Sequence, residues 1–243
     1  MTTVILFVLG AIIGSFLNVV SLRWENKNFG GRSYCPHCKK KLTSFELVPI
    51  LSFFFLLGKC RNCKTKISWQ YPLVEICTGI VFATIPMIFL PVFCVYIVIA
   101  AYDLRTKIIP DELSYTAMVL SLFVPLFFIE YSLWDWFSGP ILFLFFALVW
   151  LLSKGRAMGF GDAKLSLSIG ILLGFAKGLS SITLAFWVGA AFSVTYLLLL
   201  KWNFIKGPQG VTMKSEIPFA PFIIIGAWAS LFFNLNLLHV PIF

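Results

Sequence analysis

Long uncharged runs of apolar residues decide what this chain can fold into. The first run covers residues 4–22 and holds no charged side chain. It is long enough to cross a bilayer as a helix, which takes about 20 residues. Across the 243 residues, 60% are hydrophobic and 12% are charged. This balance excludes a water-soluble globular domain and also excludes intrinsic disorder, which requires low hydrophobicity. We therefore expect an all-α polytopic membrane protein.

The alternation of apolar and polar segments predicts the domain organisation. Residues 1–22 are expected to form a first transmembrane helix, residues 23–70 a small extramembrane domain, and residues 71–243 a second membrane domain. Prolines divide the apolar stretch 71–102 into two helices, because proline interrupts a helix. At about 20 residues a span, the chain has room for about eight transmembrane helices. The later ones are expected at 112–128, 136–152, 163–175, 182–200 and 218–233.

The positive charge of the chain indicates its orientation in a membrane. Nineteen lysines and arginines outnumber ten aspartates and glutamates, which gives a net charge of +9, and ten of the cations lie between Arg23 and Lys66. In the eight-helix arrangement, 17 of the 19 cations fall in loops on one side, and cytoplasmic loops are the ones that carry lysine and arginine. We therefore expect the 23–70 domain to be cytoplasmic. The cations are expected to contact the lipid surface and not nucleic acid.

A pattern of the form C-x-x-C-K-x-K-[LI]-[TS] occurs twice in the 23–70 domain. Two C-x-x-C pairs at this separation are typical of a structural zinc site, in which four thiolates complete a tetrahedron. Disulfides are the alternative, but the cytoplasm is reducing and favours metal binding. A site closed by four sulfurs has no position for water, so the zinc is expected to stabilise the fold of the loop. The expected ligands are Cys35, Cys38, Cys60 and Cys63.

Two acidic residues stand at the ends of apolar runs on the expected cytoplasmic side. Asp103 ends one run, and Asp162 opens another after Gly159 and Gly161. Carboxylates at this depth are costly and are therefore candidates for function. Taken singly, Asp162 also fits a helix N-cap, and Asp103 also fits a salt bridge to a nearby cation. As a pair they suit an aspartic hydrolase, in which one carboxyl donates a proton and the other activates a water. The two glycines would let a substrate strand approach the backbone closely.

A series of motifs runs along almost the whole chain, in addition to the paired cysteine turns. They are GSFLNV at 14–19, PLVE at 72–75, Asp103 through the IPD triplet at 109–111, MGFGDAKL at 158–165 and PFAPF at 218–222. With these motifs, in this order, the sequence resembles the type IV prepilin peptidase family. One departure is Ala220, where the family often has glycine. This departure weakens any role assigned to that turn and does not bear on the assignment of either aspartate.

The resemblance implies an aspartic endopeptidase of the bacterial inner membrane, with Asp103 and Asp162 as its catalytic residues. Such an enzyme removes the basic leader of a type IV prepilin or pseudopilin at the cytoplasmic face. Family members with the cysteine loop commonly also methylate the new N-terminus from S-adenosylmethionine. No nucleotide-binding fingerprint is visible, so the cofactor-binding residues stay unassigned. Glu75 is a candidate for methyl transfer, with the helix macrodipole as the alternative explanation for its position.

Two other functional classes share some of these features. A multi-span transporter with an accessory zinc domain would use buried acids to relay ions, and an assembly scaffold would use the basic loop to bind a partner. Transporters often show halves related by a repeat, whereas the repeat in this chain is confined to the cysteine turns. A pilin and the pseudopilins of secretion and of competence are equally compatible clients.

Overall fold

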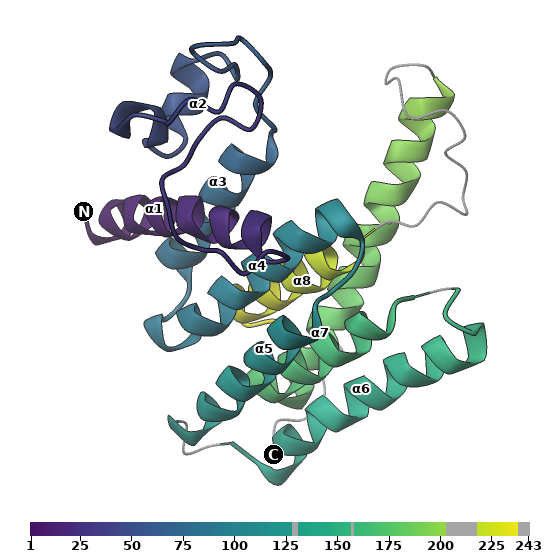
Figure 1. Cartoon of the computed structure of the whole chain (residues 1–243). Helices are drawn as coiled ribbons and strands as arrows, with labels where there is room; N and C mark the ends of the chain where they lie inside the picture. The colour runs from purple at the N-terminus through teal and green to yellow at the C-terminus, as the bar shows by residue number, and fades with distance from the viewer. Residues whose placement is uncertain (128–130, 157, 203–217, 238–243) are drawn as a thin grey trace. The chain divides into compact units, whose positions relative to one another are not determined.

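A computed structural model describes residues 1–127, 131–156, 158–202 and 218–237 (Figure 1). In these ranges the secondary structure is helical, with two isolated β-bridges and no β-strand, which confirms the expected all-α class. The α-helices are α1 (Thr2–Arg23), α2 (Leu51–Phe55), α3 (Gln70–Thr84), α4 (Leu90–Thr106), α5 (Asp111–Phe123), α6 (Leu133–Ser153), α7 (Phe160–Lys201) and α8 (Ala220–Phe232). Short 3-10 helices are η1 (Ser44–Leu47), η2 (Met87–Phe89) and η3 (Pro125–Phe127).

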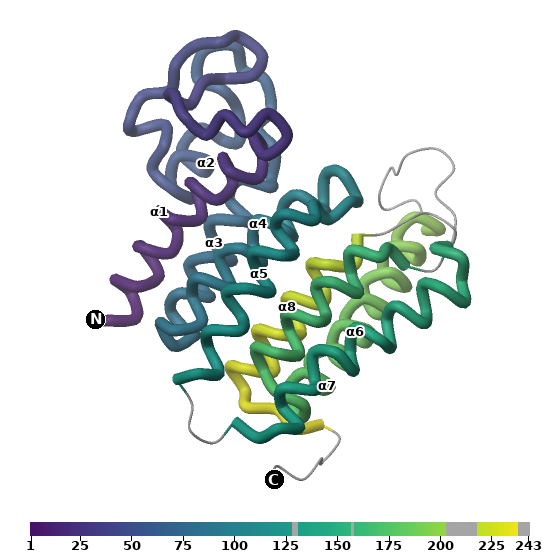
Figure 2. Tube along the Cα trace, turned by 60° about the horizontal axis from the view of Figure 1, so that its bottom comes forward, coloured from purple at the N-terminus to yellow at the C-terminus, as the bar shows by residue number. Residues whose placement is uncertain are grey.

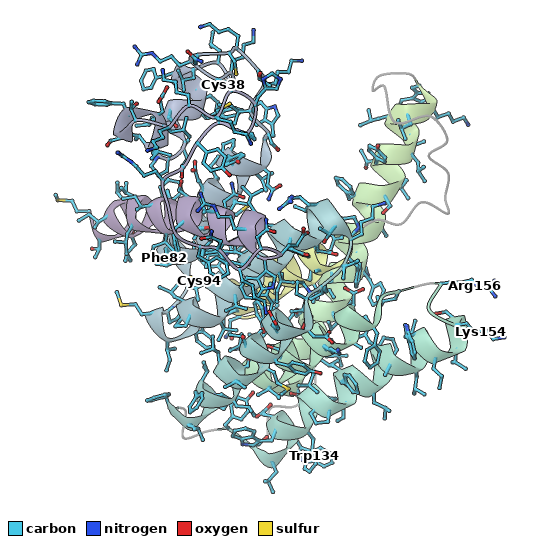
Figure 3. All side chains as sticks on the ribbon, in the orientation of Figure 1. Cys38, Phe82, Cys94, Trp134, Lys154 and Arg156 are labelled. Atoms are coloured by element: carbon cyan, nitrogen blue, oxygen red, sulfur yellow. The ribbon has the colours of Figure 1, made fainter. Side chains whose placement is uncertain are left out.

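Four of the described helical segments are long and apolar enough to cross a membrane: α1, Met87–Thr106, α6 and α7. The apolar helix α8 is shorter. An aromatic residue, Trp134, lies at the N-terminal end of helix α6, and two basic residues, Lys154 and Arg156, follow its C-terminal end (Figure 3). Tryptophan is enriched at membrane interfaces, and lysine and arginine in the loops beyond them. The chain is therefore an integral membrane protein.

Two compact units divide the chain, Met1–Ala101 and Tyr102–Phe243, and their boundary falls inside α4. In the first unit α1 packs against α3 (Figure 2). The contact is close at two glycines of α1: a Cβ on Gly10 would lie 2.7 Å from the Thr78 carbonyl oxygen, and a Cβ on Gly14 would lie 2.7 Å from the hydroxyl of the same threonine. Small residues of this kind let membrane helices approach each other.

In the second unit α7 packs against α5, α6 and α8 (Figure 2). Helix α7 extends over 42 residues, but Gly174 within it has non-helical backbone angles, with φ 75° and ψ −179°. A positive φ of this size is readily adopted by glycine alone. The break divides α7 into two helical parts, and these correspond to the separate helices expected at 163–175 and 182–200.

The side chain of Asp135 caps the starts of two helices. Its Oδ2 accepts hydrogen bonds from the Ser132 N–H and hydroxyl at 3.1 and 2.9 Å, which closes a capping box on α6. Its Oδ1 accepts the Phe175 N–H at 2.9 Å, directly after the break in α7. A Cβ on Gly174 would lie 2.5 Å from this Oδ1. Glycine at the break is therefore required for the carboxylate to reach the second part of α7.

Asp135→Ala is expected to destabilise the second unit, because it removes caps from two helix starts. Loss of one such cap usually costs about 0.5–2 kcal/mol, so the melting temperature of the purified protein should fall by several degrees. Asp135→Asn keeps an acceptor oxygen and should lose less. Thermal unfolding in detergent measures both variants. A melting temperature for Asp135→Ala equal to that of the wild type would contradict the double-cap interpretation.

Candidate active site and metal site

The four cysteines of the repeated pattern come together in the first unit, in the loop where Figure 3 labels Cys38. Their Sγ atoms all lie within 4.8 Å of one another, and the Sγ atoms of Cys35 and Cys63 are 3.8 Å apart. Four sulfurs at about 2.3 Å from a tetrahedral zinc ion are separated by about 3.8 Å. All six cysteines of the chain are free thiols. The donor set and its spacing therefore fit a zinc ion.

The repeat in the sequence is also a repeat of the backbone. In each copy the N–H of the first cysteine donates to the carbonyl oxygen five residues later, at 3.0 Å for Cys35 and 2.9 Å for Cys60. In each copy the residue after the second cysteine has a positive φ, 57° at Lys39 and 58° at Lys64. Each turn therefore presents its pair of sulfurs in the same way.

Hydrogen bonds favour the thiolate form of two of these cysteines. The Thr65 hydroxyl, whose oxygen lies 3.2 Å from the Cys63 sulfur, and the Thr65 N–H lower the pKa of the Cys63 thiol to about 6. The backbone N–H of Lys40 and the side chain of Asn62 lower the pKa of the Cys38 thiol. Because the thiolate is the metal-binding form, these contacts prepare the loop for a cation.

The two aspartates predicted to act as a pair lie together in the second unit. Asp103, in the last turn of α4, is 4% exposed, and Asp162, in the first turn of α7, is 7% exposed. The charge of Asp103 acts directly on the Asp162 carboxyl. Oδ2 of Asp103 accepts a hydrogen bond from the Ala220 N–H at 3.3 Å. Two buried carboxyls from segments far apart in the sequence are therefore near enough for the charge of one to act on the other.

Asp162 is not the N-cap of α7. The N-cap is Gly159, and Asp162 is the third helical residue, whose carboxylate bonds back to the Gly159 N–H. This is the position of the acid in a capping box. The two glycines of the turn differ in their surroundings: a Cβ on Gly161 would lie 2.8 Å from Cβ of Ile109, whereas the nearest atom to a Cβ on Gly159 is 3.6 Å away. Gly161 is therefore required for close packing against Ile109, in addition to any role it has in the approach of a substrate strand.

Gly161→Ala is expected to impair the site far more than Gly159→Ala. The first substitution forces Ile109 away and shifts the turn that carries Asp162. The second adds a methyl group at an ordinary van der Waals distance of 3.6 Å from its nearest neighbour, at a φ of −74° that alanine adopts freely. Overpacking of this kind usually costs about 1–3 kcal/mol, so Gly161→Ala should lower both the melting temperature and the rate of peptide cleavage. Equal effects of the two variants would contradict this prediction.

An aromatic cluster fixes the start of α8, where Ala220 donates to Asp103. Phe219, the N-cap of α8, lies 5.2 Å between ring centroids from Phe186 of α7 and 6.5 Å from Phe146 of α6. Ala220 is fully buried. The sequence did not predict this contact with Asp103, because the hydrogen bond of Ala220 uses its backbone N–H, a donor that every residue except proline carries.

An ion pair joins the start of α5 to the start of α7. Lys164 Nζ lies 2.6 Å from Asp111 Oδ1, and the same ammonium lies 5.4 and 5.3 Å from the ring centroids of Tyr115 and Phe160. Asp111 also has the favourable position for an acid in the first turn of α5. The pair holds α5 beside the turn that carries Asp162, and sequence reasoning missed it because 53 residues separate its members.

Glu75 is buried on α3 in the first unit, with 6% of its surface exposed. It is the sixth residue of the helix, and the first turn of α3 contains no acid, so the macrodipole does not explain it. Its Oε2 accepts the Ile50 N–H at 2.7 Å, and its carboxyl also bonds to the Ser15 hydroxyl. The carboxylate thus connects the cysteine-containing loop to α3 and α1.

Two family models match consecutive parts of the chain. The bacterial peptidase A24 N-terminal domain matches residues 8–89, and the type IV leader peptidase family matches residues 88–194. A prepilin leader peptidase/N-methyltransferase of Burkholderia pseudomallei (strain 1026b) is 31% identical over 93% of this chain and 84% of its own length. The chain belongs to the type IV leader peptidase family.

Other relatives in the type IV leader peptidase family carry the same name. The prepilin leader peptidase/N-methyltransferase of Bacillus subtilis (strain 168) is 30% identical over 92% of this chain and 91% of its own length. The prepilin leader peptidase/N-methyltransferase of Aeromonas hydrophila is 29% identical over 93% of this chain and 89% of its own length. No solved structure matches the chain. The range matched by the N-terminal domain model includes all four clustered cysteines, and the range matched by the type IV leader peptidase model includes both Asp103 and Asp162.

Proposed function

We propose that this protein is a prepilin leader peptidase and N-methyltransferase, in which Asp103 and Asp162 cut the leader from a type IV prepilin or pseudopilin. The observation that carries the proposal is a pair of buried carboxyls, in which the charge of Asp103 acts on the Asp162 carboxyl. Its full-length relatives bear this double name. The substrate is a chain with a short basic leader before an apolar segment.

In the proposed cleavage the two aspartates share one proton, because two interacting buried carboxyls do not both ionise easily. The ionised carboxyl removes a proton from a water, and the water oxygen attacks the amide carbonyl carbon. The protonated carboxyl gives its proton to the amide nitrogen as the C–N bond breaks. The Ala220 N–H orients Asp103, and the Gly159 N–H orients Asp162.

The proposed topology has eight membrane segments in the bacterial inner membrane. They are α1, α3, η2 with α4, α5 with η3, α6, the two parts of α7, and α8. This arrangement gathers 17 of the 19 cations on one side, which would be the cytoplasmic side. The cysteine-containing loop and both catalytic aspartates would face the cytoplasm, where a prepilin presents its leader.

Cys35, Cys38, Cys60 and Cys63 would hold a structural zinc ion, and S-adenosylmethionine would supply the methyl group. The zinc would join the two turns of the loop, which has 48 residues and little core of its own. Cleavage exposes an α-amine whose reference pKa is about 7.7–8.0, so a fraction of it is neutral and nucleophilic at cytoplasmic pH. Cutting and methylation would thus follow each other on one substrate.

The test uses the purified protein, a synthetic prepilin and S-adenosylmethionine, with mass spectrometry of the products. We expect one cut before the apolar segment and the gain of one methyl group that depends on S-adenosylmethionine. An intact prepilin after incubation would contradict the peptidase proposal. If the protein cleaves no prepilin but carries ions across the membrane of vesicles, a transporter is favoured. If it cleaves no prepilin but binds a partner through its basic loop, a scaffold is favoured.

A further inference from the structure

The first unit contains a second group of polar side chains, two of them buried and two half-buried, which the cleavage mechanism does not use. Ser15 and Asn18 lie on α1, one turn apart, and Gln70 and Glu75 lie on α3. Asn18 is fully buried and Glu75 is 6% exposed. Ser15 pairs with Glu75, and Asn18 pairs with Gln70. We call these four residues the α1–α3 polar cluster.

One atom of this cluster lacks a partner. Gln70 Nε2 donates to Asn18 Oδ1 at 3.2 Å and to the Ala101 carbonyl oxygen at 3.3 Å. Asn18 Nδ2 is buried and has no hydrogen-bond partner in the part of the chain that the structure describes. A buried donor left unsatisfied usually costs about 1–3 kcal/mol. The Asn18 amide therefore offers a donor to an acceptor that binds in the cluster.

The carboxylate of Glu75 is held by neutral groups. Its partners are the Ile50 N–H at 2.7 Å and the Ser15 hydroxyl, and no ion pair between described residues includes it. Ile50 has a φ of 64°, which is strained for a β-branched residue. A buried carboxylate is normally paired with a positive charge. The cluster therefore offers one anionic group and one N–H donor to a ligand.

A ligand that satisfies both groups carries a positive charge next to a hydrogen-bond acceptor. Both reactants of the proposed methylation have this chemistry. The cut pilin ends in an ammonium group followed by a carbonyl, and the amino-acid end of S-adenosylmethionine joins a sulfonium and an ammonium to a carboxylate. We propose that the α1–α3 polar cluster is the methyl-transfer site, with Glu75 binding the cation and Asn18 binding the acceptor; this rests on the proposed methyltransferase function.

The reaction at this site balances with the groups that the cluster supplies. Glu75 accepts one proton from the ammonium of the cut pilin. The nitrogen lone pair then forms an N–C bond with the methyl carbon of the sulfonium donor, the C–S bond breaks, and its electron pair goes to the sulfur. The products are a secondary amine, once its remaining extra proton leaves to solvent, and a neutral thioether. A neutral glutamine in place of Glu75 cannot accept the first proton.

The experiment compares Glu75→Gln and Asn18→Leu with the wild type in the purified full-length protein. Glutamine keeps an oxygen to accept the Ile50 N–H and removes only the charge. The matched control is Thr78→Val, because the hydroxyl of this buried α3 residue bonds to the Val74 carbonyl of its own helix at 2.7 Å. Mass spectrometry follows cleavage and methylation, and equilibrium binding follows labelled S-adenosylmethionine. Glu75→Gln should lower methylation at least about tenfold, a loss of about 1.4 kcal/mol, while cleavage stays within about twofold of the wild type.

The binding measurement separates the two reactants. Weaker binding of S-adenosylmethionine in Glu75→Gln supports the assignment with the methyl donor in the cluster. Unchanged binding of S-adenosylmethionine, together with a higher KM for the cut peptide, supports the assignment with the amine of the cut pilin in the cluster. Normal methylation in both variants, or an equal loss of cleavage and methylation, overturns it. If the wild type cuts and never methylates, the proposed methyltransferase function fails, and this assignment fails with it.

Discussion

Asp103→Asn and Asp162→Asn are each expected to abolish cleavage of a prepilin-like peptide. General acid–base catalysis by a positioned side chain contributes about 10²–10⁴-fold, and an amide side chain can neither accept the proton of water nor donate one to the leaving amine. The melting temperature should stay the same or rise, because each substitution removes a buried charge beside another acid. Initial rates of cleavage and thermal unfolding measure the two effects.

Asp111→Asn is the matched control for these two variants. Asp111 is also an acid near the starts of α5 and α7, but it is 63% exposed and its ion pair with Lys164 lies at the surface. Exposed ion pairs usually contribute about 0–1 kcal/mol, so this variant should keep most of its cleavage activity. Near wild-type cleavage by Asp103→Asn or Asp162→Asn would rule out the proposed pair. An inactive Asp111→Asn would show that loss of any acid here is damaging.

The features predicted correctly from the sequence are those that depend on local chemistry. Cys35 and Cys60 each begin a turn whose geometry follows from a few neighbouring residues, so the spacing alone predicted the cluster. The sequence also predicted that Asp103 and Asp162 act as a pair, from an expected topology with both acids on one side, and the charge of Asp103 does act on the Asp162 carboxyl. The all-α class and the presence of membrane-spanning helices were predicted from composition and from the length of the apolar runs.

The features missed depend on contacts between segments far apart in the sequence. Nothing near Asp135 indicates that it reaches Phe175, and nothing near Ile50 indicates that its N–H meets Glu75. The helices of a membrane protein are apolar on most faces, so periodicity does not show which face meets a neighbour. A hydrogen bond from a backbone N–H, such as that of Ala220, is also independent of residue type. Such positions have to be read from the fold.

Removal of the metal is expected to unfold the cysteine-containing loop while the helices stay folded. Structural zinc contributes about 10–16 kcal/mol of apparent binding free energy in small domains. The loop has 48 residues and few buried apolar side chains that could stabilise it without the metal. Phe53 is 8% exposed, but Phe45 is 86% and Phe55 is 82% exposed. Cys35→Ser with Cys60→Ser should therefore lose the metal and become sensitive to trypsin between residues 23 and 70.

Cys77→Ala is the control, because Cys77 lies on α3 outside the cluster and is exposed. Elemental analysis should find one zinc ion per chain in the wild type and in this control, and none in the double variant. Methylation should fall more than cleavage, since Ile50 in the loop contacts Glu75 and both aspartates of the proposed peptidase site belong to the second unit. Equal loss of the two activities would show that the loop also supports the peptidase fold. A zinc-free protein that resists trypsin as well as the wild type would contradict the structural role of the metal.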